Sequence, residues 1–452
     1  NVNIVNSGWG YTSNPRVILS HPQVFKKADY YIAKFSNAQY VKVNDVYVNS
    51  DKEVYLCGKT KDSSGNAVAF LAKLSASGVK EWEKTLESTA PSTGNTYLEY
   101  KKLYIDGSDV WVVGTNRPNI VALDAYNPDL ILAKYVQSDN GLDATLSFQR
   151  AYAGISGATR LDEVTSIKKL SETRFILGGY TNTNSANPMD AYVAVVDTAG
   201  SFVIKRKIAS ASASEKVTDL IVFGDNVYFT METAASSNAA DINVAVGKLT
   251  ISTSLILVDW IKQITNTTYS FLNSSLAYDE FNEIYVSSTL QLKSDDTTRD
   301  SFWVGKFDTS GDLLWNYRYV APGRDINLVP KSEIDIFGDL NIAYTRVSSV
   351  DDETTLASVK LKYNGEILNH SINKFIPTGN TVNNIEGFVG NSLSVDLSGD
   401  LHVFGQSKWN RNEFICEFDS DATDKTGHYS ITTVGASGAF EFADNVAKIF
   451  GF

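Results

Sequence analysis

The sequence contains few of the residues on which most catalytic and metal sites are built. Its 452 residues include two cysteines and four histidines. No two histidines stand at the spacing of metal ligands, and no Cys/His cluster is present. The signatures of nucleophile elbows, phosphate-binding loops and dinucleotide-binding turns are also missing. We therefore predict no catalytic residue, no metal and no cofactor, and we expect a protein that is not an enzyme.

The chain also lacks an excess of positive charge and any long apolar run. Its formal net charge is −12, whereas binding to nucleic acid requires a basic surface. No stretch approaches the roughly 18 apolar residues of a membrane-spanning helix. We therefore expect neither nucleic acid nor a membrane span among its interactions. Cys57 and Cys416 lie in the apolar strand patterns VYLCG and FICEF, which predicts two buried thiols.

The residues that are abundant favour β-strands. The chain has 23 tyrosines, 22 phenylalanines and 30 glycines, but only nine prolines. The phrase FWVGKFDTSGDLLW at residues 302–315 returns in similar form as AFLAKLSASGVKEW at residues 69–82. Each copy consists of two strands joined by a turn that contains glycine. These hairpins predict an all-β repeat fold, in which Trp315 fills a gap between neighbouring repeats.

Two strand phrases recur along the whole chain. The first is an apolar strand that often ends in glycine, and its eight copies lie at residues 54–58, 110–114, 175–179, 227–231, 284–288, 341–345, 401–405 and 447–451. The second resembles AKF, and its eight copies lie at residues 30–35, 69–74, 130–135, 191–196, 244–249, 302–307, 357–362 and 414–418. A third strand follows the second phrase, and one more apolar strand precedes each first phrase.

Four short antiparallel strands that recur roughly every 45–65 residues are typical of a β-propeller blade. The chain starts with an unpaired second phrase and ends with an unpaired first phrase at residues 447–451. We therefore expect the N- and C-terminal strands to complete one blade together. We favour eight four-stranded blades over seven, the alternative. The predicted divisions are an N-terminal β-hairpin segment at residues 1–27 and the propeller at residues 28–452.

The hairpin phrases resemble bacterial propeller repeats of the type D-x-F-V-A-K followed by G-x-x-x-W, and this resemblance covers about residues 28–451. The stretch IVNSGWGYTSNPRVIL at residues 4–19 is similar to the G-x-G-Y-T-x-x-P hairpin of phage tail and baseplate proteins. Gly8, Gly10, Tyr11 and Pro15 match that motif, whereas Ser7 replaces a glycine.

The resemblance implies an extracellular or virion location and a non-enzymatic structural or adhesion module, most plausibly a phage tail, fibre or baseplate propeller. Its expected partners are other virion or surface proteins and a host cell-surface glycan. The alternative is a stand-alone secreted or cell-surface bacterial propeller that binds carbohydrate or protein. An enzyme ranks third, and it would require Arg, Tyr, His and carboxylates grouped at one mouth of the axial channel.

The loops between the first and second phrases are the predicted place of ligand contact. They vary most in length and should all emerge on one face of the propeller. They are rich in Asn, Ser, Thr and Asp, which suits hydrogen bonding to a polar ligand such as a sugar. The candidate ligand-binding residues are Asn66, Pro118 with the adjoining Asn119, Tyr126, Asn184, Asn187, Asp295, Asp296 and Trp409.

Overall fold

A computed structural model describes residues 29–33, 41–62, 66–86, 97–117, 129–152, 161–182, 189–208, 214–234, 241–295, 298–320, 324–347, 354–373, 388–397, 399, 401–407 and 413–418. These residues form 28 β-strands, and none of them lies in a helix. The all-β class predicted from the sequence is confirmed for this part of the chain.

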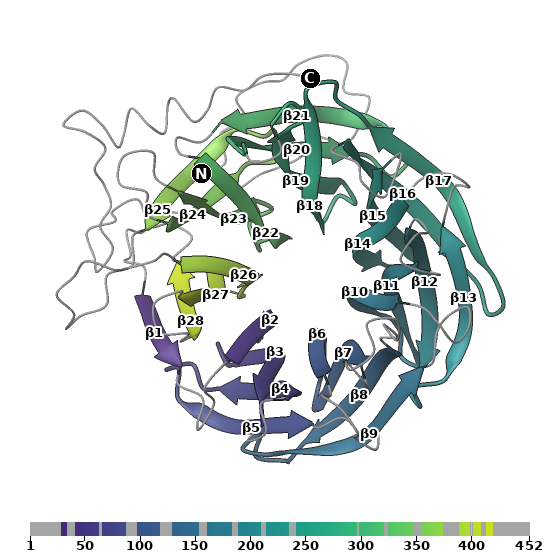
Figure 1. The fold of residues 1–452 in the computed structure, drawn as a ribbon, viewed down its shortest axis with the longest axis vertical. Helices are drawn as coiled ribbons and strands as arrows, with labels where there is room; N and C mark the ends of the chain where they lie inside the picture. Colours follow the sequence, from purple (N-terminus) through teal and green to yellow (C-terminus); the bar gives the residue numbers. More distant parts are fainter. Residues whose placement is uncertain are drawn as a thin grey trace, which may run out of the picture.

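The strands fall into four positions from the centre of the molecule outwards (Figure 1). The innermost strands are β2 (Val41–Val48), β6 (Tyr97–Asp106), β10 (Leu161–Ser171), β14 (Ser214–Phe223), β18 (Tyr269–Tyr278), β22 (Arg324–Ile334) and β26 (Phe388–Val395). The second strands are β3 (Val54–Lys61), β7 (Asp109–Arg117), β11 (Arg174–Asn182), β15 (Asn226–Ala234), β19 (Ile284–Leu292), β23 (Leu340–Val347) and β27 (Leu401–Ser407).

The third strands are β4 (Ala67–Leu74), β8 (Asp129–Gln137), β12 (Met189–Asp197), β16 (Ile242–Ile251), β20 (Ser301–Phe307), β24 (Thr354–Leu361) and β28 (Glu413–Phe418). The outermost strands are β5 (Lys80–Leu86), β9 (Ala144–Tyr152), β13 (Phe202–Ile208), β17 (Ile256–Ile264), β21 (Leu313–Val320), β25 (Ile367–Asn373) and β1 (Asp29–Ala33).

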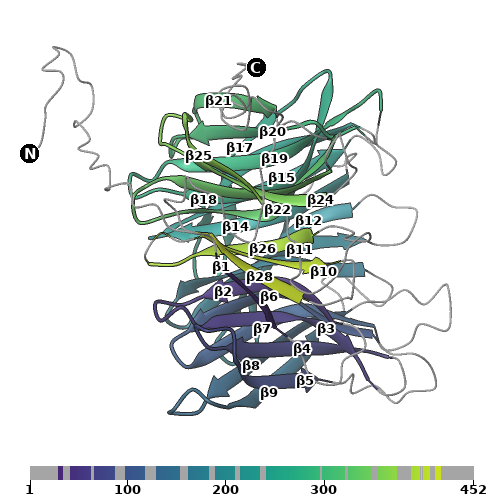
Figure 2. The same cartoon turned by 90° about the vertical axis from the view of Figure 1, so that its left-hand side faces the viewer.

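The four-stranded groups stand side by side around a central axis, which is the arrangement of a β-propeller (Figure 1). Each group is antiparallel, so the turns between first and second strands share one side of the disc with those between third and fourth strands. We call this the turn side; Figure 2 views the disc edge-on. The connections between second and third strands lie on the opposite side, which we call the loop side.

The described residues form seven four-stranded groups rather than the eight favoured from the sequence. There are five four-stranded sheets and one eight-stranded sheet, in which two groups are joined by a parallel contact between Ala67 and Tyr97. Each innermost strand contacts the next in an unbroken cycle that returns from β26 to β2. The count of eight placed the phrase at residues 30–35 in a closing blade with the strand at residues 447–451. The described part of that phrase, β1, instead pairs with β28 as an outermost strand.

The N-terminal strand thus shares a sheet with strands from near the C-terminus (Figure 1). The particular closure predicted from the sequence also used the strand at residues 447–451, which lies outside the described residues. The predicted hairpin segment at residues 1–27 lies outside them as well, so both remain predictions.

The core lies between the blades. Every residue of β20 is buried. Its sequence accordingly does not alternate between apolar and polar residues, as a strand with one exposed face would. A second or third strand is covered by a neighbouring blade on each face, so it buries both sets of side chains. One apolar cluster joins Tyr285 and Val304 of one blade to Ile342 and Val359 of the next. Cys57 is a fully buried free thiol, as predicted.

The repeated hairpin phrase encodes contacts between blades. Trp315 donates its indole N–H to the carbonyl of Tyr363 in the next blade at 3.1 Å, which confirms that it bridges neighbouring repeats. The turn residue Gly365 has a φ of 84°, and a Cβ there would lie 2.5 Å from the ring of Tyr317. Glycine is therefore required both by the backbone and by the aromatic side chains of the preceding blade.

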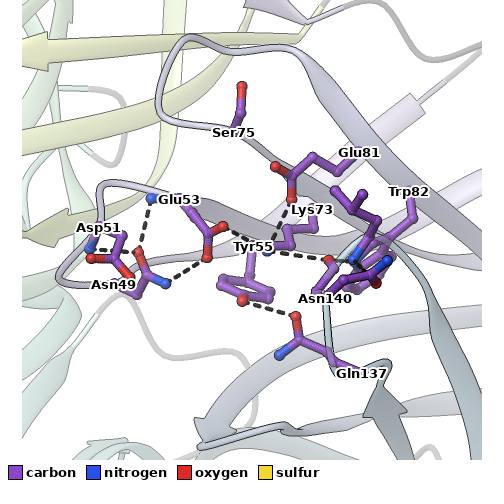
Figure 3. A network of polar contacts seen from close by, with 12 residues as sticks. Asn49, Asp51, Glu53, Tyr55, Lys73, Ser75, Glu81, Trp82, Gln137 and Asn140 are labelled. Carbon is purple, nitrogen blue, oxygen red and sulfur yellow. Dashed lines mark hydrogen bonds and ion pairs between the residues drawn. The ribbon is translucent and has the colours of Figure 1, made fainter.

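The lysine of the AKF phrase is also buried between neighbouring blades. Figure 3 shows Lys73 between Glu53 and Glu81, whose carboxylates lie 2.7 and 2.9 Å from its ammonium group. Lys73 also donates to the carbonyl of Gly141 in the next blade at 3.2 Å. Burial alone would lower the pKa of Lys73, but the hydrogen bonds to the two glutamates outweigh it and raise the pKa above its usual value. We interpret this lysine as a structural clamp.

Candidate axial binding site

A cavity of about 550 Å³ lies on the axis, towards the turn side of the disc. Side chains from six innermost strands, β2, β6, β10, β14, β18 and β22, line it together with turn residues such as Glu280. Its size lies within the range of about 300–1,000 Å³ that is typical of small-molecule sites. The cavity is therefore the candidate functional site.

An irregularity in strand pairing places polar groups around this cavity. All seven innermost strands shift register against their second strand near their middle. A bulge of this kind changes the direction of the side chains that follow it. We call the first register-paired residue after the mid-strand shift of each innermost strand a member of the bulge belt. The members are Asp45, Lys102, Ser166, Asp219, Ser275, Ser332 and Ser392.

Two aspartates of the bulge belt each connect three blades. Asp45 accepts hydrogen bonds from the hydroxyl of Ser392 at 2.8 Å and from the backbone N–H of Leu103 at 3.2 Å. Asp219 accepts from the hydroxyl of Ser166 at 3.0 Å and from the backbone N–H of Leu276 at 3.1 Å. Both carboxylates are therefore held in fixed orientations by the blades on either side.

Four charged groups near the axis form two oppositely charged pairs, Asp45 with Lys102 and Glu333 with Lys331. Burial alone would raise the pKa of Asp45, but Lys102, Lys331 and the hydrogen bonds outweigh it and lower the pKa. Burial alone would lower the pKa of Lys331, but Glu333 and Asp45 raise it above its usual value. Lys331 lies 2.8 Å from Glu333, and Lys102 lies 3.8 Å from Asp45. Asp45 and Lys331 therefore stay ionised at neutral pH and offer a fixed acceptor and a fixed donor.

Four aromatic side chains line the cavity on the turn side of the bulge belt. We call Tyr47, Tyr104, Phe223 and Tyr278 the aromatic rim. Phe223 and Tyr278 lie edge to face with their ring centroids 4.9 Å apart, and Tyr47 is the most exposed of the four, at 36%. Burial raises the pKa of Tyr47, Tyr104 and Tyr278, so their hydroxyls remain protonated donors at neutral pH.

The residues predicted as ligand contacts lie elsewhere. Asn66 donates its backbone N–H to the carboxylate of Asp62 at 2.8 Å and thereby orders its own loop. Asp295 is exposed and accepts a hydrogen bond from Thr298. Both belong to connections on the loop side, away from the axial cavity. The other predicted contacts lie outside the described residues; they are Pro118 with Asn119, Tyr126, Asn184, Asn187, Asp296 and Trp409. As a ligand site, the set stays a prediction.

The axial cavity was not expected from the sequence, although the sequence contains a signal for it. The apolar strand before each first phrase is interrupted by a polar residue at an equivalent place, as in NDVYV with Asp45 and TDLIV with Asp219. A polar residue repeated at a buried position indicates a shared hydrogen-bonded belt. Within the described residues, no group of three or more His, Cys, Asp or Glu could hold a metal ion, and no helix is long and apolar enough to cross a membrane.

Comparison with known proteins gives a likeness of fold. No family model matches the sequence, and no curated protein matches it. The chain is similar to the β-propeller domain of the Trilobed protease from Pyrococcus furiosus, with 8% identity, a TM-score of 0.43, and coverage of 86% of this chain and 99% of that one. It is also similar to an α-L-arabinofuranosidase of Fusarium graminearum, with 11% identity, a TM-score of 0.47, and coverage of 76% and 99%.

A third similar structure is the acylaminoacyl peptidase of Pyrococcus horikoshii, with 9% identity and a TM-score of 0.42. The match covers 83% of this chain and 51% of the peptidase. Our expectation of a protein that is not an enzyme is contradicted by these enzymes and is withdrawn. Its basis was the shortage of histidine and cysteine, but hydrolysis by paired carboxylates needs neither. At these identities and TM-scores the likeness transfers no reaction, substrate or residue role.

Proposed function

We propose that this chain binds an uncharged, polar ligand of the carbohydrate class in its axial cavity. The observation that carries the proposal is the aromatic rim next to the bulge belt within one cavity. A sugar ring presents C–H faces that pack on aromatic rings and hydroxyls that both donate and accept hydrogen bonds. Ligand sites commonly combine such an apolar wall with a few convergent polar groups.

The ion pairs of the cavity favour an uncharged ligand. Glu333 pairs with Lys331, and Asp45 lies near Lys102. Asp279, at the turn side, is 3.3 Å from the buried Lys306. A charged ligand would have to displace one of these pairs and leave its partner uncompensated in a buried place, which is costly. A neutral ligand can use the same groups as hydrogen-bond partners without that cost.

The proposal belongs to the second of the two functions expected from the sequence, a secreted or cell-surface propeller that binds carbohydrate. That location remains a proposal too. Neither the fold nor the comparisons support a virion role, and the axial site does not depend on it. Whether the bound sugar is only held or also cleaved is decided by the same experiment as binding itself.

The test measures saccharide binding by the intact chain and by two tyrosine variants. A panel of neutral oligosaccharides is screened, and each hit is titrated by calorimetry. Tyr104→Ala removes one ring of the aromatic rim, and we expect affinity to fall at least tenfold. Tyr363→Ala is the matched control, because Tyr363 is an exposed tyrosine in the outer β24–β25 turn, and we expect unchanged affinity. Mass analysis of the recovered sugar reports any cleavage.

Two outcomes would overturn the axial proposal. One is saccharide binding that Tyr104→Ala leaves unchanged, which would place the sugar elsewhere on the molecule. The other is the absence of saturable binding to any neutral saccharide at millimolar concentration. Circular dichroism and thermal unfolding of each variant establish that a loss of binding is not a loss of fold.

A further inference from the structure

Three lysines converge on one carboxylate at the loop-side ends of β2, β3 and β6. The ammonium groups of Lys101, Lys42 and Lys59 lie 3.0, 3.7 and 3.7 Å from the oxygens of Glu99. Asn44 donates to the same carboxylate at 2.8 Å. Lys42 and Lys59 are direct cross-strand partners, where like charges normally repel each other.

Glu99 is the fixed centre of this cluster. Its side chain is fully buried, whereas those of Lys42 and Lys101 are 37% and 26% exposed. Burial alone would raise the pKa of Glu99, but Lys101, Lys59, a hydrogen bond from Tyr97 and Lys42 outweigh it and lower the pKa to about 2. The carboxylate therefore stays ionised and attracts the ammonium groups from the buried side of the cluster. The ammonium groups of Lys42 and Lys101 keep access to solvent.

The cluster carries more positive than negative charge. Among the described residues, Glu99 is the ion-pair partner of both Lys42 and Lys101, so two ammonium groups share one carboxylate before Lys59 is considered. A single lysine would suffice to compensate Glu99. Bringing further cations beside it costs energy through their mutual repulsion, unless a second anion completes the cluster. This excess of positive charge is confined to the cluster, because the chain as a whole has a formal net charge of −12.

We propose that Lys42 and Lys101 form a binding site for an oxyanion group, with Glu99 as the residue that positions them. Each of these two ammonium groups has three N–H donors, and Glu99 does not use all of them. Lys59 adds positive charge beside them, and its own ammonium donates to the hydroxyl of Tyr97 at 2.7 Å. The ligand class is a tetrahedral or planar oxyanion, such as a phosphate, a sulfate or a carboxylate. The site lies at the starts of β2 and β6, whereas the axial cavity is lined by their later residues, Tyr47 and Tyr104. It is therefore independent of the proposed sugar site.

The first experiment titrates the intact chain with inorganic phosphate, sulfate and glucuronate at constant ionic strength set by chloride. We expect saturable calorimetric binding in the millimolar range or tighter, and the ranking of the three probes tells phosphate, sulfate and carboxylate ligands apart. Lys42→Gln and Lys101→Gln should each weaken binding about tenfold. Lys362→Gln is the matched control, because this lysine is equally exposed but pairs with Glu366 in an outer turn, and it should bind as the native chain does.

The second experiment needs no variant. Acetylation of the native chain by an N-hydroxysuccinimide ester is followed by peptide mass analysis with and without phosphate. We expect phosphate to slow the modification of Lys42 and Lys101 but not that of Lys362. If phosphate changes the modification rate of all three lysines by the same factor, or if the native chain and both glutamine variants bind phosphate with equal affinity, the site is refuted. Tyr104→Ala should leave phosphate binding intact, so failure of the sugar proposal does not decide this one.

Discussion

Lys306 shows how one buried charged side chain holds two blades together. Its side chain is 2% exposed and forms ion pairs with Asp279 and Glu283 of its own blade. It also donates to the backbone carbonyl of Tyr363 in the next blade at 3.1 Å. Lys73 repeats this arrangement with Glu53, Glu81 and the carbonyl of Gly141.

Replacing Lys306 by methionine tests the clamp. Asp279 and Glu283 would lose their cation, and breaking a buried pair by removing one partner costs about 3–5 kcal/mol. The control is Lys362→Met, because Lys362 pairs with an exposed glutamate and such pairs contribute about 0–1 kcal/mol. Urea unfolding gives both free energies. Equal losses in the two variants would mean that Lys306 does not join the blades.

Glu99 makes stability depend on pH in a defined direction. Its pKa falls from 4.5 to about 2 in the folded protein, so the folded state binds the proton less tightly than the unfolded state does. The resulting stability is fully present above about pH 4.5 and is lost as pH falls towards 2. At about 1.4 kcal/mol per pKa unit, the full effect is about 3 kcal/mol.

The comparison variant for this pH effect is Glu99→Gln, which keeps the shape of the side chain but cannot titrate. We expect its free energy of unfolding to change less between pH 5 and pH 3 than that of the native chain, when both are measured with urea in matched buffers. Parallel curves for the two proteins would contradict the role assigned to Glu99.

At the scale of the element, the outer hairpin turns carry the contacts between blades. Gly338 and Gly365 adopt almost the same backbone angle, with φ values of 83° and 84°. They differ in their surroundings. A Cβ on Gly338 would meet nothing within 4 Å, whereas one on Gly365 would lie 2.5 Å from Tyr317 and 3.2 Å from Trp315.

Alanine at the two positions separates the backbone cost from the packing cost. Gly338→Ala should destabilise by about 1–2 kcal/mol, the cost of a left-handed conformation for an L-residue. Gly365→Ala should cost a further 1–3 kcal/mol or so, because the added methyl group overpacks the interface. Urea unfolding of both variants measures the difference. A difference near zero would show that the aromatic side chains move aside freely.

These outer hairpins were predictable from the sequence because each repeat forms the same hairpin and packs its turn against a neighbouring blade. The turn glycine stands four residues before a tryptophan in two copies, Gly78 with Trp82 and Gly311 with Trp315, so the hairpin and its contact between blades could be inferred from these residues. The axial site was not inferred. Its residues are far apart in the sequence, and only the ring brings Asp45 next to Ser392 and Asp219 next to Ser166.

At the scale of the whole molecule, the blade count depended on one strand. The phrase at residues 30–35 resembles a third strand in sequence. The apolar pattern of a strand, however, does not determine which other strand it pairs with. Only the pairing of β1 with β28 shows that it lies outermost. Repeats therefore predicted the all-β class and the four-stranded units, whereas the way in which the ring ends could not be read from them.

The pairing of β1 with β28 can be tested by one substitution. Tyr30 lies opposite Cys416, and Tyr31 lies opposite Ile415. Antiparallel partners have Cα atoms about 4.5–5.5 Å apart, which suits a disulfide. We expect Tyr30→Cys to form a disulfide with Cys416 under mild oxidation. The bond would close a loop that spans most of the chain, so the loss of chain entropy in the unfolded state should stabilise the fold by about 5–6 kcal/mol.

Tyr31→Cys is the matched control, because successive residues of a strand point to opposite faces of the sheet. Its thiol should not reach Cys416, and its thermal unfolding should not depend on the oxidant. Non-reducing peptide mapping by mass spectrometry identifies the bond, and gel electrophoresis separates it from dimers linked between chains. If Tyr31→Cys crosslinks as readily as Tyr30→Cys, the register of β1 is wrong. If neither crosslinks, β1 does not close the ring, and the sheet of β26, β27 and β28 must be completed by another segment of the chain.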